Sequence, residues 1–352
     1  MNQEPDNLSG YKCGHNSDEE AFVRETLGVL AETPVEMTAI GKGGSDRAYF
    51  RVAAGRPPVV LMRYGDMYEE NDVYVSVASL LREIGVSVPA IHNHDPKRRL
   101  ILMEDLGDID LYSLREKPWG ERHVLYEKTL EIAAKMHAFS SEQIGSAKPG
   151  ASGAAFLMPG YDEKLYSWER NYFRENLVRN VCRLEIGPQE NNKLETELAG
   201  LAARFLKTKV SLIHRDFQSQ NVMIKEGKPV LIDFQGLRFG SLFYDLGSLI
   251  YDPYVQFPEG ARDALLRYYY DLAGSVYSWE AFRALFFQAS AQRLMQALGA
   301  YGFLGLRRGK PHFLLHIPRA LQNLVEVSGE SGVLPRLNAL ARRCHGCMPQ
   351  FS

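Results

Sequence analysis

Apolar residues in the first third of the chain occur in short runs that are rich in β-branched and aromatic side chains. Such runs, separated by segments rich in glycine and proline, predict β-strands. The predicted strands cover residues 37–40, 48–52, 59–62 and 100–103. Helical spacing predicts one helix before them at 19–31 and one among them at 73–84, which ends at Gly85. We therefore expect a small antiparallel sheet with one inserted helix.

From Leu111 onward the apolar positions follow the helical period instead. The predicted helices cover residues 121–140, 162–181, 189–207, 260–273, 279–301 and 311–327. One β-rich island interrupts them, with strands at 211–213, 221–224 and 229–233 and a turn at Glu226-Gly227. The chain is thus expected to be α+β and bilobal, with a flexible segment at 1–18, a β-rich lobe at 19–105 and a helical lobe at 106–352.

Charge and composition exclude several classes of function. The 352 residues carry 41 Lys and Arg against 43 Asp and Glu, so the basic excess of a general nucleic-acid binder is missing. No apolar run approaches the roughly 18 residues that span a bilayer, and no signal segment is recognised. Four scattered cysteines do not make a disulfide framework. We expect a cytoplasmic protein with neither a membrane nor a nucleic-acid partner.

The most informative stretch is His214-Arg215-Asp216, with Asn221 five residues after the aspartate. This spacing matches the catalytic loop H-R-D-x-x-x-x-N of kinase-like enzymes, and Asp233 follows an apolar strand where a second metal ligand would stand. Phosphoryl transfer from ATP needs a carboxylate that orients the attacking hydroxyl and oxygen ligands that hold Mg²⁺. The pattern predicts Asp216 in the first role and Asn221 with Asp233 in the second.

Two weaker signals fit a nucleotide site. The segment Leu102–Gly107 leaves a predicted strand, and its backbone at Glu104 and Leu106 could pair with adenine. Gly44 and Ser45 lie between two predicted strands, where they could cover phosphates or form a plain hairpin turn.

With these residues the sequence resembles the aminoglycoside phosphotransferase family, and within it the anomeric N-acetylmuramate/N-acetylglucosamine kinases of bacterial cell-wall recycling. The matching segments are 44–52, 80–89, 103–108, 214–223, 232–236, 244–246 and 251–254. The resemblance implies a bilobal protein-kinase-like fold, ATP and Mg²⁺ as cofactors, and a transferase whose acceptor is an alcohol group.

Carried onto this sequence, the resemblance makes Asp216 the catalytic base, and it makes His214 and Asp245 braces of the catalytic loop. The residues placed to touch sugar hydroxyls, or to support those that do, are Gln218, Gln235 and Arg238. One position departs from the pattern: the strand that should carry the ATP-binding lysine ends in Arg63. Arg63 could bind the α- and β-phosphates, although arginine and lysine differ in reach and geometry.

Charge also bears on the acceptor. From Ala291 to the end there are eight Lys and Arg, including Arg293, against two acids, which suits a neutral or anionic sugar better than a polycation. Aromatic residues between Tyr166 and Phe173, Trp168 among them, either stack on a sugar or belong to the core.

We therefore expect a monomeric small-molecule kinase that phosphorylates a sugar hydroxyl, and the acceptor we expect is the anomeric hydroxyl of an amino sugar. The alternatives are an aminoglycoside or choline-like kinase and a nucleotide-binding pseudokinase.

Overall fold

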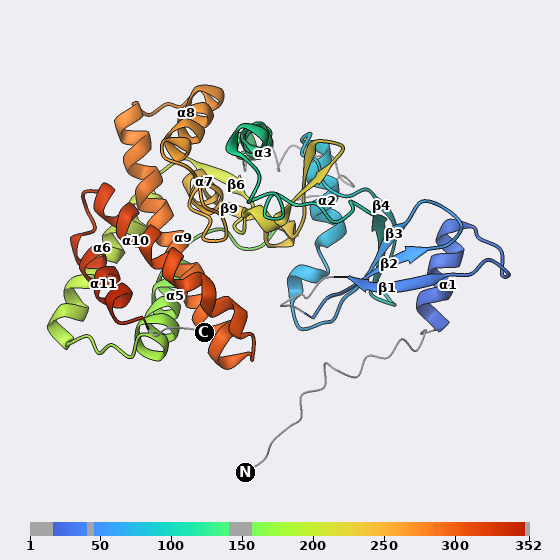
Figure 1. The fold of residues 1–352 in the computed structure, drawn as a ribbon, viewed down its shortest axis with the longest axis horizontal. Coiled ribbons are helices and arrows are strands. Elements are labelled where there is room, and N and C mark those ends of the chain that lie inside the picture. Colours follow the sequence, from blue (N-terminus) through green and yellow to red (C-terminus); the bar gives the residue numbers. More distant parts are fainter. Residues whose placement is uncertain (1–16, 41–45, 141–156, 349–352) are drawn as a thin grey trace, which may run out of the picture. The chain divides into compact units, whose positions relative to one another are not determined.

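The computed structural model describes residues 17–40, 46–140 and 157–348 (Figure 1). The chain divides into two compact units. The N-terminal unit comprises Met1–Val75 and Pro89–Asp105, and the C-terminal unit comprises Ser76–Val88 and Leu106–Ser352. Residues 76–88 group with the second unit, whereas the division expected from the sequence put them in the first. Each unit is described below by itself.

The N-terminal unit contains one antiparallel sheet of five strands in the order β1-β2-β3-β5-β4. Its strands are β1 (Glu36–Ile40), β2 (Ala48–Ala53), β3 (Val59–Arg63), β4 (Ile91–Asp95) and β5 (Leu100–Glu104), preceded by helix α1 (Ser17–Leu27). The expected antiparallel sheet is confirmed. Strand β4 was missed because its sequence, Ile-His-Asn-His-Asp, lacks an apolar pattern, and pairing with β5 alone holds it at the sheet edge.

Helix α1 covers one face of this sheet. Its Phe22 and Val23 are buried against side chains of β2, β3 and β5, among them Leu61 and Leu102. Because successive strand residues point to opposite faces, Arg63 lies on the same face as Leu61, the face that α1 covers. A short 3₁₀ turn (Glu69–Asn71) then leads to α2 (Tyr74–Glu83), which spans the boundary between the units.

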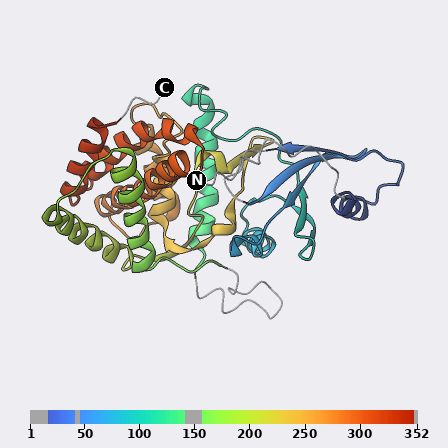
Figure 2. The same ribbon diagram turned by 90° about the horizontal axis from the view of Figure 1, so that it is seen from below.

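The C-terminal unit is mainly helical, as expected (Figure 2). Its helices are α3 (Trp119–Ala138), α5 (Glu163–Phe173), α6 (Pro188–Phe205), α7 (Leu242–Ile250), α8 (Ala261–Ala273), α9 (Trp279–Arg307), α10 (Ile317–Glu330) and α11 (Pro335–Gly346). Its strands form two pairs: β6 (Val210–Ile213) with β9 (Arg238–Ser241), and β7 (Val222–Lys225) with β8 (Lys228–Leu231). A π-helical stretch, η3 (Arg174–Val181), continues α5, and a 3₁₀ segment, η6 (Pro311–His316), precedes α10.

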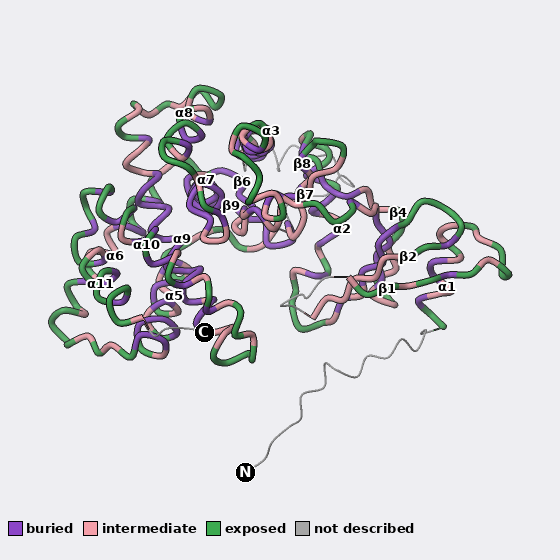
Figure 3. The backbone as a smooth tube through the Cα atoms, viewed as in Figure 1, coloured by how far each residue is buried: buried purple, intermediate pink, exposed green. Residues whose placement is uncertain are grey.

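Helix α9 is the centre of this unit and contacts α5, η3, α7, α10 and η6. Its residues from Phe286 to Gly299 are buried without interruption, as Figure 3 shows by the purple stretch at its middle. When a helix is buried on every side, each polar side chain that it carries needs a hydrogen-bond partner within the protein. Several such side chains occur in α9, and they connect it to the site described next.

None of the helices in the described part of the chain has the length and apolar character needed to cross a membrane.

Candidate active site

The predicted catalytic loop begins where β6 ends. Strand β6 pairs with β9 so that Ile213 lies opposite Arg238, and the chain then turns at His214 and Arg215. Arg215 has a φ of 77°, in the left-handed region that non-glycine residues rarely adopt. Such backbone strain persists only where the surrounding structure holds it, and it concentrates at functional sites.

The side chain of Asp245 holds this turn in place. Its buried carboxylate accepts hydrogen bonds from the backbone N–H of His214 (2.7 Å) and of Arg215 (2.8 Å). It also lies 3.2 Å from Nε2 of the buried His137, whose Nδ1 contacts the hydroxyl of Tyr269. Two charge-assisted bonds to consecutive backbone N–H groups fix the strained turn, since each is stronger than a bond between neutral groups.

The β7–β8 hairpin brings Asn221 and Asp233 to one end. Val222 pairs with Leu231, and the N–H of Ile232 donates to the carbonyl oxygen of Asn221 at 3.0 Å, so the residues that flank the hairpin are neighbours. The ring Nε2 of His214 lies 3.0 Å from the carbonyl oxygen of Ile232 and ties the loop to the same end. The expected turn residues, Glu226 and Gly227, both have positive φ, as a two-residue hairpin turn of this type requires.

The side chains at this end suit a hard divalent cation. Asn221 Nδ2 donates to the carbonyl oxygen of Asp216 at 2.9 Å, so that Oδ1 is the atom left for a metal, and Asp233 adds carboxylate oxygens. Asp233 has a φ of 58°, a second left-handed residue at the site. No group of three or more His, Cys, Asp and Glu within the described ranges forms a metal site of its own. Mg²⁺ is commonly held by one or two carboxylate ligands together with phosphate oxygens and waters.

Asp216 is surrounded by positive charge. Burial alone would raise the pKa of its carboxyl, but the nearby Arg215, Arg293 and Arg238 bring that pKa below its ordinary value. Nη2 of Arg293 lies 3.4 Å from Asp216 Oδ1. Asp216 is therefore ionised at neutral pH and able to accept a hydrogen bond from a hydroxyl.

The three side chains expected to touch a sugar differ in their surroundings. The Oε1 atom of Gln218 is 3.4 Å from Nη2 of Arg293, beside Asp216. Gln235 donates from Nε2 to Asp233 Oδ1 at 2.9 Å. Arg238 is buried, donates from Nε to the carbonyl oxygen of Gly236 and lies over the ring of Tyr161.

A buried glutamate, Glu169, is the centre of a hydrogen-bond network near the catalytic loop. Glu169 of α5 is fully buried and accepts hydrogen bonds from the hydroxyls of Tyr161 and Tyr244 (2.9 Å each) and from Nε2 of Gln292 (2.8 Å). Burial raises the pKa of Glu169, although these bonds and the charge of Arg215 act against the shift. The network links α5, α7 and α9 around the loop.

A second buried carboxylate fixes the loop further along. Asp252 accepts from the N–H of Ser219 (2.8 Å), from its hydroxyl (2.5 Å) and from the N–H of Tyr254 (2.9 Å). Ser219 lies between Asp216 and Asn221, so both ends of the catalytic loop are held by buried aspartates.

Sequence reasoning missed the position of Arg293. It counted this residue only as one of eight cations in the last part of the chain, whereas the structure places it, 6% exposed, beside Asp216. The available signal was an arginine within the long apolar pattern of the helix, where an unpaired charge would be costly.

The aromatic residues of α5 divide between core and surface. Tyr166 and Phe173 are buried, while Trp168 is 48% exposed and stacks on Tyr172 with ring centres 4.8 Å apart.

The predicted nucleotide residues of the N-terminal unit have partners within that unit. Nη1 of Arg63 forms an ion pair with Oε1 of Glu19 in α1 at 2.6 Å. Glu104 accepts from the N–H of Ala90 through Oε2 and donates its own N–H to the Ala90 carbonyl oxygen. That Arg63 binds a phosphate stays a prediction, since the structure shows it paired with a carboxylate.

The remaining nucleotide residues differ in what the structure shows. Gly44 and Ser45 lie outside the described residues. Leu106 is buried, and it is the first residue of the segment Leu106–Ser352 of the C-terminal unit. The residue before it, Asp105, forms a two-point ion pair with Arg51 of β2, at 2.6 and 3.1 Å.

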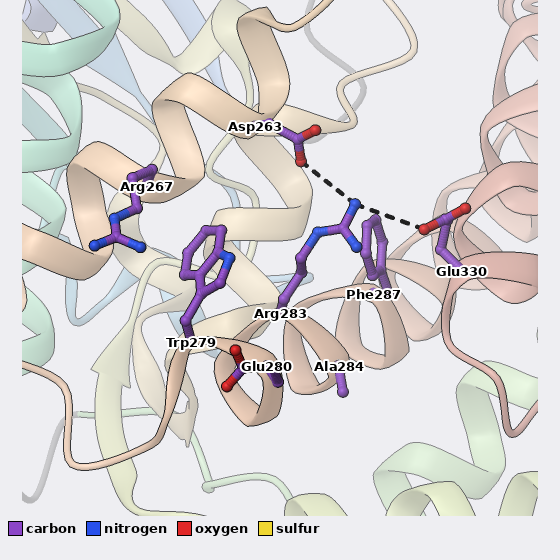
Figure 4. A pocket seen from close by; sticks show the side chains of 8 residues that line it. All are labelled: Asp263, Arg267, Trp279, Glu280, Arg283, Ala284, Phe287 and Glu330. Atoms are coloured by element: carbon purple, nitrogen blue, oxygen red, sulfur yellow. Dashed lines mark ion pairs between the residues drawn. The ribbon is translucent and has the colours of Figure 1, made fainter.

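A hollow of about 520 Å³ lies elsewhere in the C-terminal unit, among α8, α9 and α10 (Figure 4). At its centre Arg283 reaches toward Asp263 and Glu330, at 3.6 Å from each. None of its lining residues belongs to the constellation around Asp216.

Comparison with known proteins gives a consistent result. The model of the phosphotransferase enzyme family, APH, matches residues 36–285. An N-acetylmuramate/N-acetylglucosamine kinase of Pseudomonas aeruginosa is 27% identical over 310 residues, which cover 87% of this chain and 87% of that protein. The kinase of the same name from Neisseria meningitidis serogroup B is 26% identical and covers 89% of this chain and 91% of its own.

The fold is also shared with a solved structure. A choline/ethanolamine kinase family protein from Mesorhizobium loti superposes with a TM-score of 0.56 at 15% identity and covers 92% of this chain and 99% of that one. The match confirms the expected fold class, and at this identity it shows the fold alone.

Proposed function

The chain belongs to the phosphotransferase enzyme family and is a small-molecule kinase, and from this premise we propose that it phosphorylates a sugar hydroxyl with ATP and Mg²⁺. The acceptor we propose is an amino sugar of the N-acetylglucosamine or N-acetylmuramate type, phosphorylated at its anomeric hydroxyl. Two relatives that match most of the chain carry these sugars in their names.

The observation that carries the choice of acceptor is the charge around Asp216. Arg215, Arg238 and Arg293 all act on its carboxyl within the C-terminal unit. A polycationic aminoglycoside or a choline would be repelled by these positive charges, whereas a neutral sugar would not be repelled and an acidic sugar would be attracted. This favours the sugar over the two cationic alternatives.

In the proposed reaction, Asp216 accepts a hydrogen bond from the sugar hydroxyl and orients its oxygen toward the γ-phosphorus of ATP. As the new bond to phosphorus forms, the bond from the γ-phosphorus to the bridging oxygen of ADP breaks, ADP leaves, and Asp216 takes the hydroxyl proton. Asn221 and Asp233 would hold the Mg²⁺, which would neutralise charge on the transferred group. Asp245 and Asp252 keep the loop between these side chains in one conformation. The retention of Asp216, Asn221 and Asp233 argues against a pseudokinase.

The test is magnesium-dependent ADP release with a panel of acceptors: N-acetylglucosamine, N-acetylmuramate, glucosamine, choline and kanamycin. We expect turnover with an N-acetylated amino sugar and a fall of about 1,000-fold or more in kcat for Asp216→Asn, which keeps the shape but loses the base. Phosphorus NMR of the product should show an anomeric phosphate.

Turnover with choline or kanamycin alone would overturn the acceptor and keep the kinase. ATP binding without turnover on any acceptor, in a folded protein, would favour the pseudokinase. Equal activity of wild type and Asp216→Asn would contradict the role of the aspartate.

A further inference from the structure

Arg293 lies in the fully buried part of α9, where a guanidinium needs acceptors for its N–H groups. Four acceptors surround it. Nε donates to the hydroxyl of Ser248 at 3.1 Å and Nη1 donates to Oε1 of Gln296 at 2.7 Å. Nη2 lies 3.4 Å from both Asp216 Oδ1 and Gln218 Oε1. Each nitrogen of the guanidinium therefore has a defined direction.

The first two contacts fix Arg293, and the other two lead from it to the candidate active site. Ser248 belongs to α7, three residues after the loop brace Asp245. Helices α7 and α9 approach so closely that a Cβ on Gly247 would stand 2.8 Å from the backbone of Ser290. Nε of Arg293 is thus bonded to α7, the helix that also carries Asp245 and so holds the catalytic loop.

Asp216 and Arg293 differ in how far their side chains are exposed to solvent. The side chain of Asp216 is 34% exposed and can be reached by an acceptor, while that of Arg293 is 7% exposed. The two other arginines that lower the pKa of Asp216 are placed differently: Nε of Arg238 donates to the carbonyl oxygen of Gly236, and Nε of Arg215 is buried without a hydrogen-bond partner among the described residues. Among the described residues, Arg293 is the one whose side chain contacts the Asp216 carboxylate.

We propose that Arg293 is a positioning residue, which holds the Asp216 carboxylate and the Gln218 amide in the orientation that receives the acceptor hydroxyl. This inference rests on the kinase function proposed above. Because its two contacts to the site come from one nitrogen of a fixed planar group, Arg293 sets the rotation of both side chains at once. Lysine, a single flexible point charge, cannot reproduce the four directed contacts.

The experiment compares Arg293→Gln, Arg293→Ala and Ser248→Ala with Arg283→Gln. Arg283 lies on the same helix but is 38% exposed and pairs with acids of the surface hollow, so it is the matched control. For Arg293→Gln we expect kcat to fall about 100-fold, the loss typical of a misplaced reacting group, with both KM values within about threefold of wild type.

Two further measurements separate positioning from folding. Guanidinium ion added at millimolar concentration should restore the kcat of Arg293→Ala at least about tenfold, because it can occupy the vacated site between the same acceptors. Ser248→Ala should lower kcat about fivefold with unchanged binding of MgATP, since Arg293 keeps its other contacts. Arg283→Gln should match wild type.

Unchanged kcat in Arg293→Gln would overturn the proposal. So would a loss of activity that follows the folded fraction and is not restored by guanidinium. A rise confined to the KM of an acidic acceptor would make Arg293 a substrate-binding residue instead. If wild type itself turns over no acceptor, the proposed function fails and this role fails with it, whereas an active wild type tests Arg293 alone.

Discussion

In the C-terminal unit the candidate site residues are held by one another and by buried carboxylates, whereas in the N-terminal unit they pair with residues of the sheet and its covering helix. Asp216 sits on a loop fixed by Asp245 and Asp252 and beside Arg293. Arg63 and Glu104, by contrast, contact Glu19 and the Ala90 backbone.

The difference teaches that the two halves of the predicted site have different tolerance to change. Buried carboxylates that accept several backbone N–H groups leave unsatisfied donors when altered, so the catalytic loop should be sensitive throughout. The Arg51–Asp105 and Arg63–Glu19 pairs of the N-terminal unit each join a partly exposed arginine to a carboxylate that is 8% exposed, so solvent screens each pair in part and its loss should cost less than that of a fully buried brace.

Among the residues that support the two halves of the site, the largest effect is expected from Asp245→Asn. One carboxylate oxygen becomes an NH₂ group that faces a backbone N–H of His214 or Arg215, so one buried donor is left without an acceptor. We expect unfolding free energy to fall by about 2–4 kcal/mol and kcat to fall about 100-fold in the protein that stays folded. Urea unfolding and ADP release measure the two losses.

The matched control is Asp263→Asn, an exposed carboxylate at the surface hollow, which should change neither quantity. A stable, fully active Asp245→Asn would show that the loop does not depend on this brace.

Arg51→Ala tests whether the N-terminal unit contributes to nucleotide binding. Its two bonds fix Asp105, which lies between Glu104 and Leu106, the two residues expected to pair with adenine. We expect the KM for ATP to rise about tenfold, which corresponds to about 1.4 kcal/mol, with little change in kcat. Steady-state kinetics at varied ATP measures it, and Arg24→Ala, which removes a pair within α1, serves as the control. An unchanged KM would limit the Arg51–Asp105 pair to a structural role.

Glu169→Gln is expected to change how stability depends on pH. Burial raises the pKa of Glu169 above its ordinary value of 4.5, so the folded protein binds this proton more tightly than the unfolded chain does. The stability contributed by Glu169 is therefore greatest at low pH and falls as pH rises from its ordinary value through the raised one, by about 1.4 kcal/mol per unit of pKa shift.

Urea unfolding at pH 5 and pH 8 should show Glu169→Gln gaining stability relative to wild type as pH rises. The reverse trend would mean that Tyr161, Tyr244 and Gln292 lower the pKa of this carboxyl rather than leave it raised.

The smallest effect is expected from the Arg63–Glu19 pair. Arg63 is 35% exposed and the Glu19 carboxylate 8% exposed, so Glu19→Gln, which removes the buried charge, should cost less than about 1 kcal/mol, and Arg63→Ala, which leaves that charge unpaired, about 1 kcal/mol; a double-mutant cycle gives the pairwise part. We expect the KM for ATP to be unchanged in both variants. A severalfold rise in Arg63→Ala alone would assign Arg63 to a phosphate and make Glu19 its support.

Local patterns determined much of this protein in advance. The antiparallel sheet, most helices of the C-terminal unit and the Glu226-Gly227 turn follow from residue spacing, because strand and helix periods and turn residues act over a few positions. The spacing of Asp216 and Asn221 predicted a catalytic loop for the same reason, since both lie within one short segment.

Only the tertiary structure decided which distant side chains surround that loop. Strand β4, whose polar sequence gains its structure from its neighbour, could not be predicted from a local pattern. The contacts of Arg293 with Asp216, of Glu169 with Gln292, and of Arg63 with Glu19 join residues 44 to 123 positions apart. Such pairs form because burial forces each polar group to find a partner, and the partner is selected by the packing of helices and strands rather than by the sequence around it.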